Sequence, residues 1–350
     1  MKLPIRILLV FLCAALIIAM PFVLSSPDML SEAVNELYDR DMEDDDEGDD
    51  DEIDFSSWLI SSARAEEENV EEAEIELFST EVNWELPVDR TPGPKPNAAL
   101  FTDNSYEDET IRATLEVEKE EKVTWYIIRV QIASPTQLRT AIIPGKNPAK
   151  VSAMAAANNA VVAISGDYYA NDAEKTTLEY RMGEPIPGRQ RRNGKKDVLI
   201  IDDQGDFHLF QKSEGLFTKN SKGKWQFTYE GSVVNAFTFG PALVIDGKLI
   251  EVDTEYGYHP TGHEPRAAIG QTGKLSYILL IAQASDRDGK TGATHQELAN
   301  KMYSLGCTQA FNLDGGGTAE AIFGDQQIIG QPGGERSQSD IIYFATAVPE

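Results

Sequence analysis

The chain has 350 residues, of which 41% are hydrophobic, and its formal net charge is −27. This length is too short for three domains and predicts one large or two modest ones with a real core. Because phosphate binding needs a basic face, the acidic balance argues against nucleic acid as a partner. We expect no disulfide framework and no cysteine-based metal site, since the chain has only Cys13 and Cys307.

The N-terminus predicts a membrane segment. Lys2 and Arg6 precede an apolar run from Ile7 to Leu24, which as a helix would span about 27 Å, close to the thickness of the hydrocarbon core. The positive flank would stay in the cytoplasm, so the remaining chain would lie outside. Two interpretations stay open for residues 1–25: a single-pass anchor in the cell membrane, or a cleaved signal peptide that leaves the protein secreted.

The acidity of the chain belongs mainly to the next segment. Residues 26–90 contain 25 Asp or Glu against three Arg, and the chain from Thr91 onward carries a net charge of only −7. Like charges at this density repel one another, so we predict a disordered acidic linker over residues 26–99 that acts as a solvated spacer. A folded domain is then expected over residues 100–350.

Strand patterns dominate that domain. β-branched and aromatic residues or short apolar runs predict several strands, at Val123–Ile132, Ala160–Ser165, Val198–Asp202, Phe207–Gln211, Trp225–Tyr229, Ala242–Ile245, Leu249–Val252, Gln309–Leu313 and Ile341–Thr346. Between Ala242–Ile245 and Leu249–Val252, Asp246-Gly247 indicates a hairpin turn. We therefore predict an α+β fold: a mixed, mostly β-sheet domain with a few covering helices.

Two helices carry capping signals. Asn147 as cap and Pro148 at the first helical position predict a helix that runs to Ala157. A second helix is predicted from Thr294 to Leu305, because Thr294 and Glu297 have the spacing of a capping box and Gly306 suits the left-handed C-terminal position.

Two glycine-rich turns that carry Asp follow predicted buried strands. Gly166-Asp167 follows the first, and Asp314 with Gly315, Gly316 and Gly317 follows the second, between Asn312 and Thr318. Such turns concentrate reactive groups, and successive glycine amides can form a nest for phosphate. A tight turn without a ligand is the competing interpretation.

Arg266 precedes another apolar strand and could hold phosphate in a bidentate manner or make a surface ion pair. His259 and His263 flank it, but no third ligand stands at metal spacing.

These motifs together resemble the phosphodiester glycosidase family, which includes the enzyme that uncovers mannose 6-phosphate and bacterial proteins of exopolysaccharide biosynthesis. The resemblance rests on segments in the family's order, of which Asn312–Gly317 is the most specific: Ala163–Tyr169, Phe239–Leu243, Pro265–Gly270, the helix at Thr294, Asn312–Thr318 and Arg336–Phe344. Two places depart from the family pattern: Ser165 stands where Asn is usual, and the order around Asp286 is altered.

The resemblance implies an extracytoplasmic hydrolase that cleaves a sugar from a sugar-1-phosphodiester, of N-acetylglucosamine type or in a cell-surface polysaccharide. The same resemblance makes Asp167 and Asp314 the acid and base candidates, in either order, with Arg266 holding phosphate. The substrate-binding residues that it implies are Gly166, Tyr168, Asp286, Asn312, Gly315, Gly316, Gly317 and Thr318. No cofactor is expected, and the question of a divalent metal stays open, as does the oligomeric state. The alternative function is a non-catalytic module of the cell surface that binds a glycan or teichoic acid.

Overall fold

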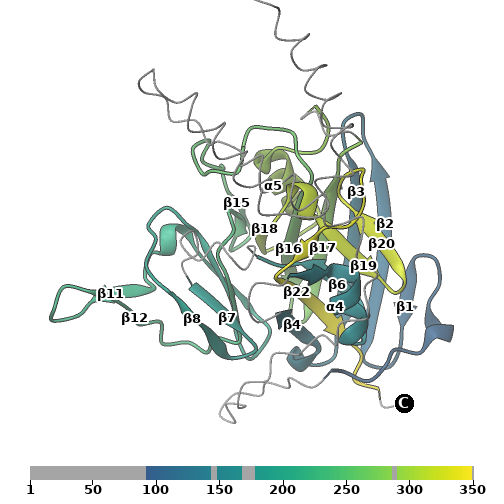
Figure 1. Ribbon diagram of the computed structural model, residues 1–350, viewed down its shortest axis with the longest axis horizontal. Coiled ribbons are helices and arrows are strands. Elements are labelled where there is room, and N and C mark those ends of the chain that lie inside the picture. Colours follow the sequence, from purple (N-terminus) through teal and green to yellow (C-terminus); the bar gives the residue numbers. More distant parts are fainter. Residues whose placement is uncertain (1–91, 143–147, 168–177, 286–289, 349–350) are drawn as a thin grey trace, which may run out of the picture. The chain divides into compact units, whose positions relative to one another are not determined.

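The computed structural model describes residues 92–142, 148–167, 178–285 and 290–348 (Figure 1). The predicted anchor, the linker up to residue 91 and the cap at Asn147 lie outside the described residues, so those expectations stay predictions. Within the described ranges, no helix combines the length and the apolar character that a membrane crossing needs.

Two antiparallel sheets form the centre of the domain. The larger sheet has eight strands, in the order β1 (Ser105–Glu107), β2 (Ile111–Lys119), β3 (Thr124–Ile132), β17 (Ser276–Gln283), β16 (Arg266–Gly273), β18 (Gln309–Leu313), β14 (Ala242–Ile245) and β15 (Lys248–Leu249). The second has five strands, in the order β20 (Gln326–Ile329), β19 (Glu320–Phe323), β6 (Ala160–Ser165), β22 (Asp340–Ala345) and β4 (Leu138–Ile142).

Three smaller sheets complete the strand content. One has five strands, in the order β10 (Phe207–Phe210), β9 (Val198–Ile201), β13 (Asn235–Phe237), β7 (Leu178–Arg181) and β8 (Glu184–Gln190). The others are the pairs β11 (Phe217–Lys219) with β12 (Trp225–Phe227), and β5 (Ala149–Lys150) with β21 (Ser337–Gln338).

The two central sheets pack face to face because their strands alternate between two cores. Ile128 of β3, Leu279 of β17 and Ile164 of β6 lie in the core between the sheets. The intervening residues Ile127 and Leu280 point to the opposite face of the large sheet, where α5 (His295–Ser304) covers them. On the outer face of the second sheet, α4 (Val151–Ala157) packs in the same manner. Period-two alternation with apolar residues on both faces is what strands buried on both sides require.

The mostly β fold with two described helices agrees with the α+β prediction. The prediction of a mixed sheet, in which parallel and antiparallel strand pairs occur together, was wrong. Every strand pair in the described residues is antiparallel. Neighbours such as β2 and β3, or β16 and β17, follow one another through short turns, and short turns can join only antiparallel strands.

The second predicted helix is confirmed in detail, and the first begins later than expected. Thr294 caps α5, with both hydrogen bonds of the capping box present, and Gly306 has a φ of +87°. Helix α4 begins at Val151 because Ala149 and Lys150 are extended and pair with β21.

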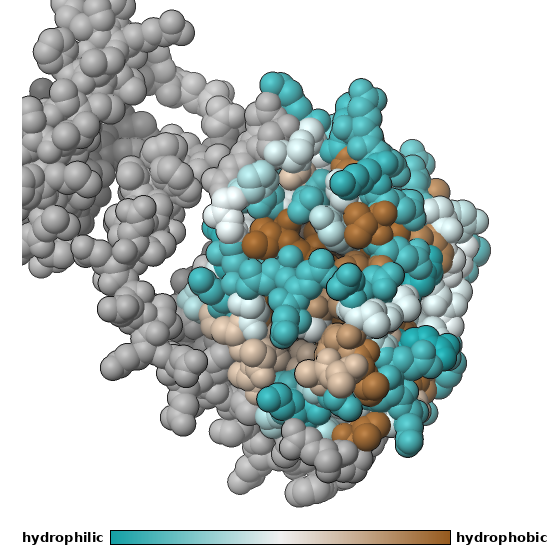
Figure 2. Space-filling view, turned by 90° about the vertical axis from the view of Figure 1, so that its right-hand side faces the viewer, coloured by the Kyte–Doolittle hydropathy of each residue, from teal (hydrophilic) through white to brown (hydrophobic). Residues whose placement is uncertain are grey.

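The surface turned to the viewer in Figure 2 is largely hydrophilic, and its hydrophobic residues lie in small separate patches. The described part of this face therefore offers no continuous apolar docking surface.

Gly270 of β16 lies where the large sheet contacts Met302 of α5 and Cys307, which follows the helix. A Cβ on Gly270 would lie 2.6 Å from Cys307 Sγ, 2.7 Å from Met302 Cε and 3.0 Å from the Gln309 carbonyl oxygen. Burial also raises the pKa of the Cys307 thiol to about 12, so this thiol stays neutral, as expected for a small buried hydrophobic side chain.

We expect Gly270→Ala to lower the free energy of unfolding by about 1–3 kcal/mol, because the added methyl group overpacks the contact with α5. Urea denaturation would measure the change. Gly273→Ala is the matched control in the same strand, since a Cβ there meets nothing within 4 Å. Equal stability of the two variants would contradict the packing argument.

Candidate active site

The two acidic turns predicted from the sequence meet in space. Strand β6 of the second sheet ends at Ser165, and β18 of the large sheet ends at Leu313. The backbone N–H of Asp314 donates a hydrogen bond of 3.1 Å to the Gly166 carbonyl. The ends of two strands from different sheets are thus held side by side, and each presents an Asp.

Asp167 is a buried carboxyl in which one of the two oxygens has a hydrogen-bond partner and the other has none. Its side chain is 1% exposed, and its Oδ2 accepts a bond of 2.8 Å from the Thr238 backbone N–H. Its own backbone N–H donates to Asp340 Oδ1 over 2.9 Å. Asp167 Oδ1 has no hydrogen-bond partner. Such an oxygen is costly to bury as an anion and cheaper to bury as a neutral acid.

Further buried charges surround Asp167. Arg181 lies between two carboxylates, with its Nε 2.7 Å from Asp340 Oδ2 and its Nη2 3.8 Å from Asp167 Oδ2. Glu179 pairs with Arg189 over 2.6 Å. In this cluster three carboxylates face two guanidinium groups. Burial, followed by the charge of Glu179, raises the pKa of Asp167 well above its usual range, which favours the protonated form of this carboxyl.

The sequence analysis missed the partners of Asp167. Their signal in the sequence was limited to charged residues at strand positions: Glu179 and Arg181 alternate with Leu178 and Tyr180 in β7, and Asp340 begins the apolar strand β22. Gly166 is required at its position because a Cβ there would lie 2.5 Å from Asp340 Oδ1.

Asp314 has a different environment from Asp167. It is partly exposed, and Gln338 Nε2 lies 3.5 Å from its Oδ2. Burial raises its pKa to about 7, while the neighbouring polar groups of Thr318 and Gln338, the Gly315 amide and the charge of Arg336 act in the opposite direction. Both protonation states are therefore populated at neutral pH, which suits a group that takes and returns a proton.

The glycine loop is built around its own hydrogen bonds. Gly316 has a φ of +60°, and its N–H donates to the Pro265 carbonyl over 2.7 Å. The Thr318 hydroxyl donates to the Gly315 carbonyl over 2.6 Å. The Gly316 amide is thus already used, and the Gly315 amide is directed at the Asp314 carboxyl, so the predicted nest of three glycine amides does not fit this arrangement. Gly317 lies against Arg336, whose Nη1 would be 2.8 Å from a Cβ at this position.

The expected phosphate role of Arg266 does not fit the structure either. The side chain is 3% exposed. Its five N–H donors are all used, by the carbonyl groups of Ala293, Tyr258, His259 and Gly262 and by His295 Nε2, over 2.7–3.1 Å. Arg266 therefore fixes the 258–262 loop and offers no free donor to a ligand.

Asn312 also holds neighbouring backbone in place. Its Nδ2 donates to the Gly240 carbonyl over 2.6 Å, and its backbone N–H donates to the Pro241 carbonyl over 3.0 Å. Ser165, one of the two departures from the family pattern, is fully buried and accepts a bond from the Glu320 N–H. Tyr168 and Asp286 lie outside the described residues.

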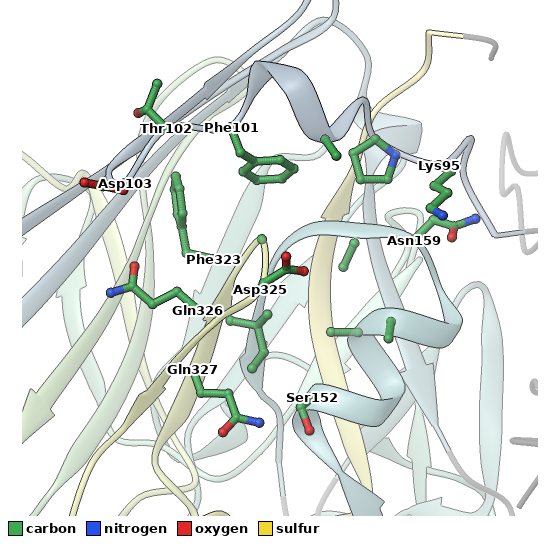
Figure 3. Close-up of a pocket in the computed structure, with 17 residues that line it drawn as sticks. Lys95, Phe101, Thr102, Asp103, Ser152, Asn159, Phe323, Asp325, Gln326 and Gln327 are labelled. Carbon is green, nitrogen blue, oxygen red and sulfur yellow. The ribbon is translucent and has the colours of Figure 1, made fainter. Parts of the chain in front are cut away.

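A cavity of about 760 Å³ lies elsewhere, between α4, the β19–β20 turn and residues 95–103. Figure 3 shows Phe101 and Phe323 on one side of it and Asp325, Gln326 and Gln327 along another. It contains neither Asp167 nor Asp314, so the acidic turns, and not this cavity, carry the candidate chemistry. Among the described residues no group of three or more His, Cys, Asp or Glu could hold a metal ion.

The comparisons with solved structures concern the fold. The catalytic domain of zebrafish N-acetylglucosamine-1-phosphodiester alpha-N-acetylglucosaminidase, described as auto-inhibited by its pro-peptide, superposes with a TM-score of 0.50 at 15% identity, over 75% of this chain and 97% of that one. A hypothetical protein from Synechocystis gives a TM-score of 0.47 at 15% identity, over 68% of this chain and 63% of that one. This chain thus spans less than two thirds of the Synechocystis protein.

The comparison with family models concerns the sequence. No curated protein matches the chain, but the model described as phosphodiester glycosidase matches residues 158–345, more than half of its length. The matched range contains both acidic turns, the glycine loop and Arg336. It confirms the resemblance found in the motifs: the chain belongs to the phosphodiester glycosidase family, a family of hydrolases.

Proposed function

We propose that the chain hydrolyses a sugar-1-phosphodiester, releasing the sugar and leaving a phosphomonoester. Family membership supports this reaction class. The observation that carries the proposal is Asp314, a partly exposed carboxyl with a pKa of about 7 beside the Arg336 guanidinium. A proton acceptor and a fixed positive charge are the two groups that this reaction needs.

In the proposed reaction, water attacks the anomeric carbon and the bond from that carbon to the phosphate oxygen breaks. The bonding electrons leave with the phosphate, and the proton of the attacking water passes to Asp314. A phosphomonoester has a second pKa of about 6, so it departs near neutral pH without needing a proton. General-base help to the water is therefore the larger requirement, and we assign it to Asp314.

Arg336 replaces Arg266 as the proposed phosphate-binding residue. Its side chain is exposed, and its guanidinium group lies against the glycine loop at Gly317. Among the described residues no ion pair occupies it. A planar guanidinium matches two phosphate oxygens at once, which a buried and fully bonded Arg266 cannot do.

Asp167 is proposed as a positioning residue. Its backbone N–H donates to Asp340 and its Oδ2 accepts from the Thr238 N–H, and these bonds keep the Gly166 turn in place. That turn holds the Asp314 backbone. This assignment separates the two Asp residues that the sequence analysis left interchangeable.

The setting of the reaction follows the sequence expectations. We propose that residues 1–25 anchor the chain in a membrane and that the catalytic domain acts outside the cytoplasm on an N-acetylglucosamine-type or cell-surface polysaccharide phosphodiester. The reaction as proposed uses no cofactor. Parallel assays with and without EDTA would test for a divalent metal.

Replacing Asp314 with Asn should lower kcat by about 10²–10⁴, because Asn cannot accept the proton. Release of free sugar from a panel of sugar-1-phosphodiesters, including UDP-N-acetylglucosamine, would measure the effect. For the unaltered protein, kcat/KM should rise with pH and level off above about pH 7, since the base must be ionised. Near-normal turnover by Asp314→Asn would refute the assignment. Tight binding of a substrate without turnover by the unaltered protein would favour the glycan-binding alternative.

The two arginines should respond differently to substitution. Arg336→Ala should lower kcat/KM by about 10²–10³ with little loss of stability, because an exposed phosphate contact is removed. Arg266→Lys should lower the free energy of unfolding by about 2–4 kcal/mol, since several buried hydrogen bonds are lost. Thermal unfolding and steady-state kinetics on both variants would distinguish the roles. If Arg336→Ala behaved like the unaltered protein in kinetics, Arg336 would not bind phosphate.

A further inference from the structure

A cluster of exposed cations lies on a part of the protein that the proposed reaction does not use. Six residues form what we call the basic hairpin surface: Arg192, Lys195, Lys219, Lys222, Lys224 and Trp225. All six are exposed. They come from the loop before β9 and from the β11–β12 hairpin. Neither residues 188–196 nor residues 217–227 contain an acidic residue, although the whole chain carries a net charge of −27.

The base of the hairpin is fixed and its outer part projects. Strands β11 and β12 pair only with each other, and Figure 1 shows them extending away from the strands β7 and β8. Phe217 and Phe227 anchor the base, with ring centroids 5.6 Å apart, and Phe227 also contacts Tyr180 of β7 at 5.9 Å. A partner could therefore contact the cations without disturbing the core.

Trp225 holds two of the cations in place. The guanidinium carbon of Arg192 lies 4.4 Å from the centroid of its ring, and Lys219 Nζ lies 5.2 Å from it. Cation–π contacts of this kind reduce the freedom of long side chains before binding. No ion pair with a described acidic residue neutralises Arg192, Lys219 or the two lysines of the turn between the strands. The surface thus presents several uncompensated positive charges, two of them already positioned.

The chemistry of a partner follows from these features. Uncompensated Arg and Lys side chains along a hairpin match a chain of regularly spaced anions. Trp225 remains 46% exposed, but cations lie over its ring, so it is poorly placed to insert into a lipid surface. A phosphodiester is ionised at every working pH and is the group that we propose is cleaved at Asp314.

We propose that the basic hairpin surface binds the anionic chain of a phosphodiester-linked glycan, a part of the substrate remote from the bond that is cleaved. This inference rests on the proposed function, because it identifies the substrate class as a polymer and not a single sugar phosphodiester. Binding at the hairpin would raise the local concentration of cleavable ends at Asp314.

Binding is tested on the full-length chain carrying Asp314→Asn, so that the ligand is not consumed. The probe is an oligomer of sugars joined by phosphodiesters, and affinity is measured over a range of salt. We expect Lys219→Ala/Lys222→Ala/Lys224→Ala to weaken binding by about tenfold and to reduce its salt dependence. Lys119→Ala/Lys122→Ala/Lys248→Ala removes the same charge from exposed positions outside the surface and should have little effect.

Trp225→Leu separates positioning from charge. It leaves the net charge unchanged, yet it should weaken binding of the oligomer several-fold, because Arg192 and Lys219 lose their support. Arg192→Ala should weaken binding as well. The hairpin tip is exposed, so the fold should persist, and circular dichroism would check this. Unchanged affinity in the triple lysine variant and in Trp225→Leu would overturn the proposal.

Kinetics with Asp314 intact separate this inference from the proposed function. Hairpin variants should raise KM for the oligomer while leaving kcat, and all kinetics with a single sugar-1-phosphodiester, unchanged. If the protein hydrolysed a single sugar-1-phosphodiester but the hairpin variants left the KM for the oligomer unchanged, only the role of the basic hairpin surface would be overturned. Hairpin-dependent binding without any hydrolysis would overturn the proposed function instead. Equal hairpin-dependent affinity for single-stranded DNA with the same number of phosphates, or for anionic lipid vesicles, would also overturn the assignment to a glycan.

Discussion

One backbone hydrogen bond organises the candidate active site. The Asp314 N–H donates to the Gly166 carbonyl and joins the end of a strand in the large sheet to the end of a strand in the second sheet. The bond depends on a residue without a side chain, because the Asp340 carboxylate occupies the space where a Cβ of Gly166 would lie. The two sheets pack through their apolar faces, and this contact decides which strand ends meet. The site is therefore a product of sheet packing as much as of its own residues.

The same junction gives two aspartates opposite properties. Asp167 lies under the protein surface with Arg181 and Asp340, where the loss of solvent, followed by the charge of the third carboxylate, Glu179, raises its pKa. Asp314 lies nearer to solvent and keeps several donors around it, so its pKa stays near neutrality. Groups of one chemical type can divide the work of a site when their environments shift their pKa values by different amounts. Asp167 and Asp314 differ in this way although a single hydrogen bond joins the turns that carry them.

The arginines show where sequence reasoning reached its limit. Arg266 and Arg336 both lie in segments that resemble the family, and a sequence does not say how many donors of a guanidinium group are already used. The structure places Arg266 where four carbonyl groups and His295 take all its donors, whereas Arg336 stays exposed beside Gly317. The net charge was equally uninformative about the hairpin cations around Trp225, because a sum over the chain hides a local cluster of the opposite sign.

The sequence by itself determined what depends on neighbouring residues: strand β6 from its apolar run, helix α5 from its capping box, the β14–β15 turn from Asp246-Gly247, and the family from the order of its motifs. Only the tertiary structure decided what depends on residues far apart in the chain. It made all described strand pairs antiparallel, shortened α4 by pairing Ala149 and Lys150 with β21, and surrounded Asp167 with Glu179, Arg181 and Asp340. The physical reason is that local propensity acts over a few residues, whereas burial, and with it the pKa of a carboxyl and the availability of a donor, is set by whatever the fold packs against it.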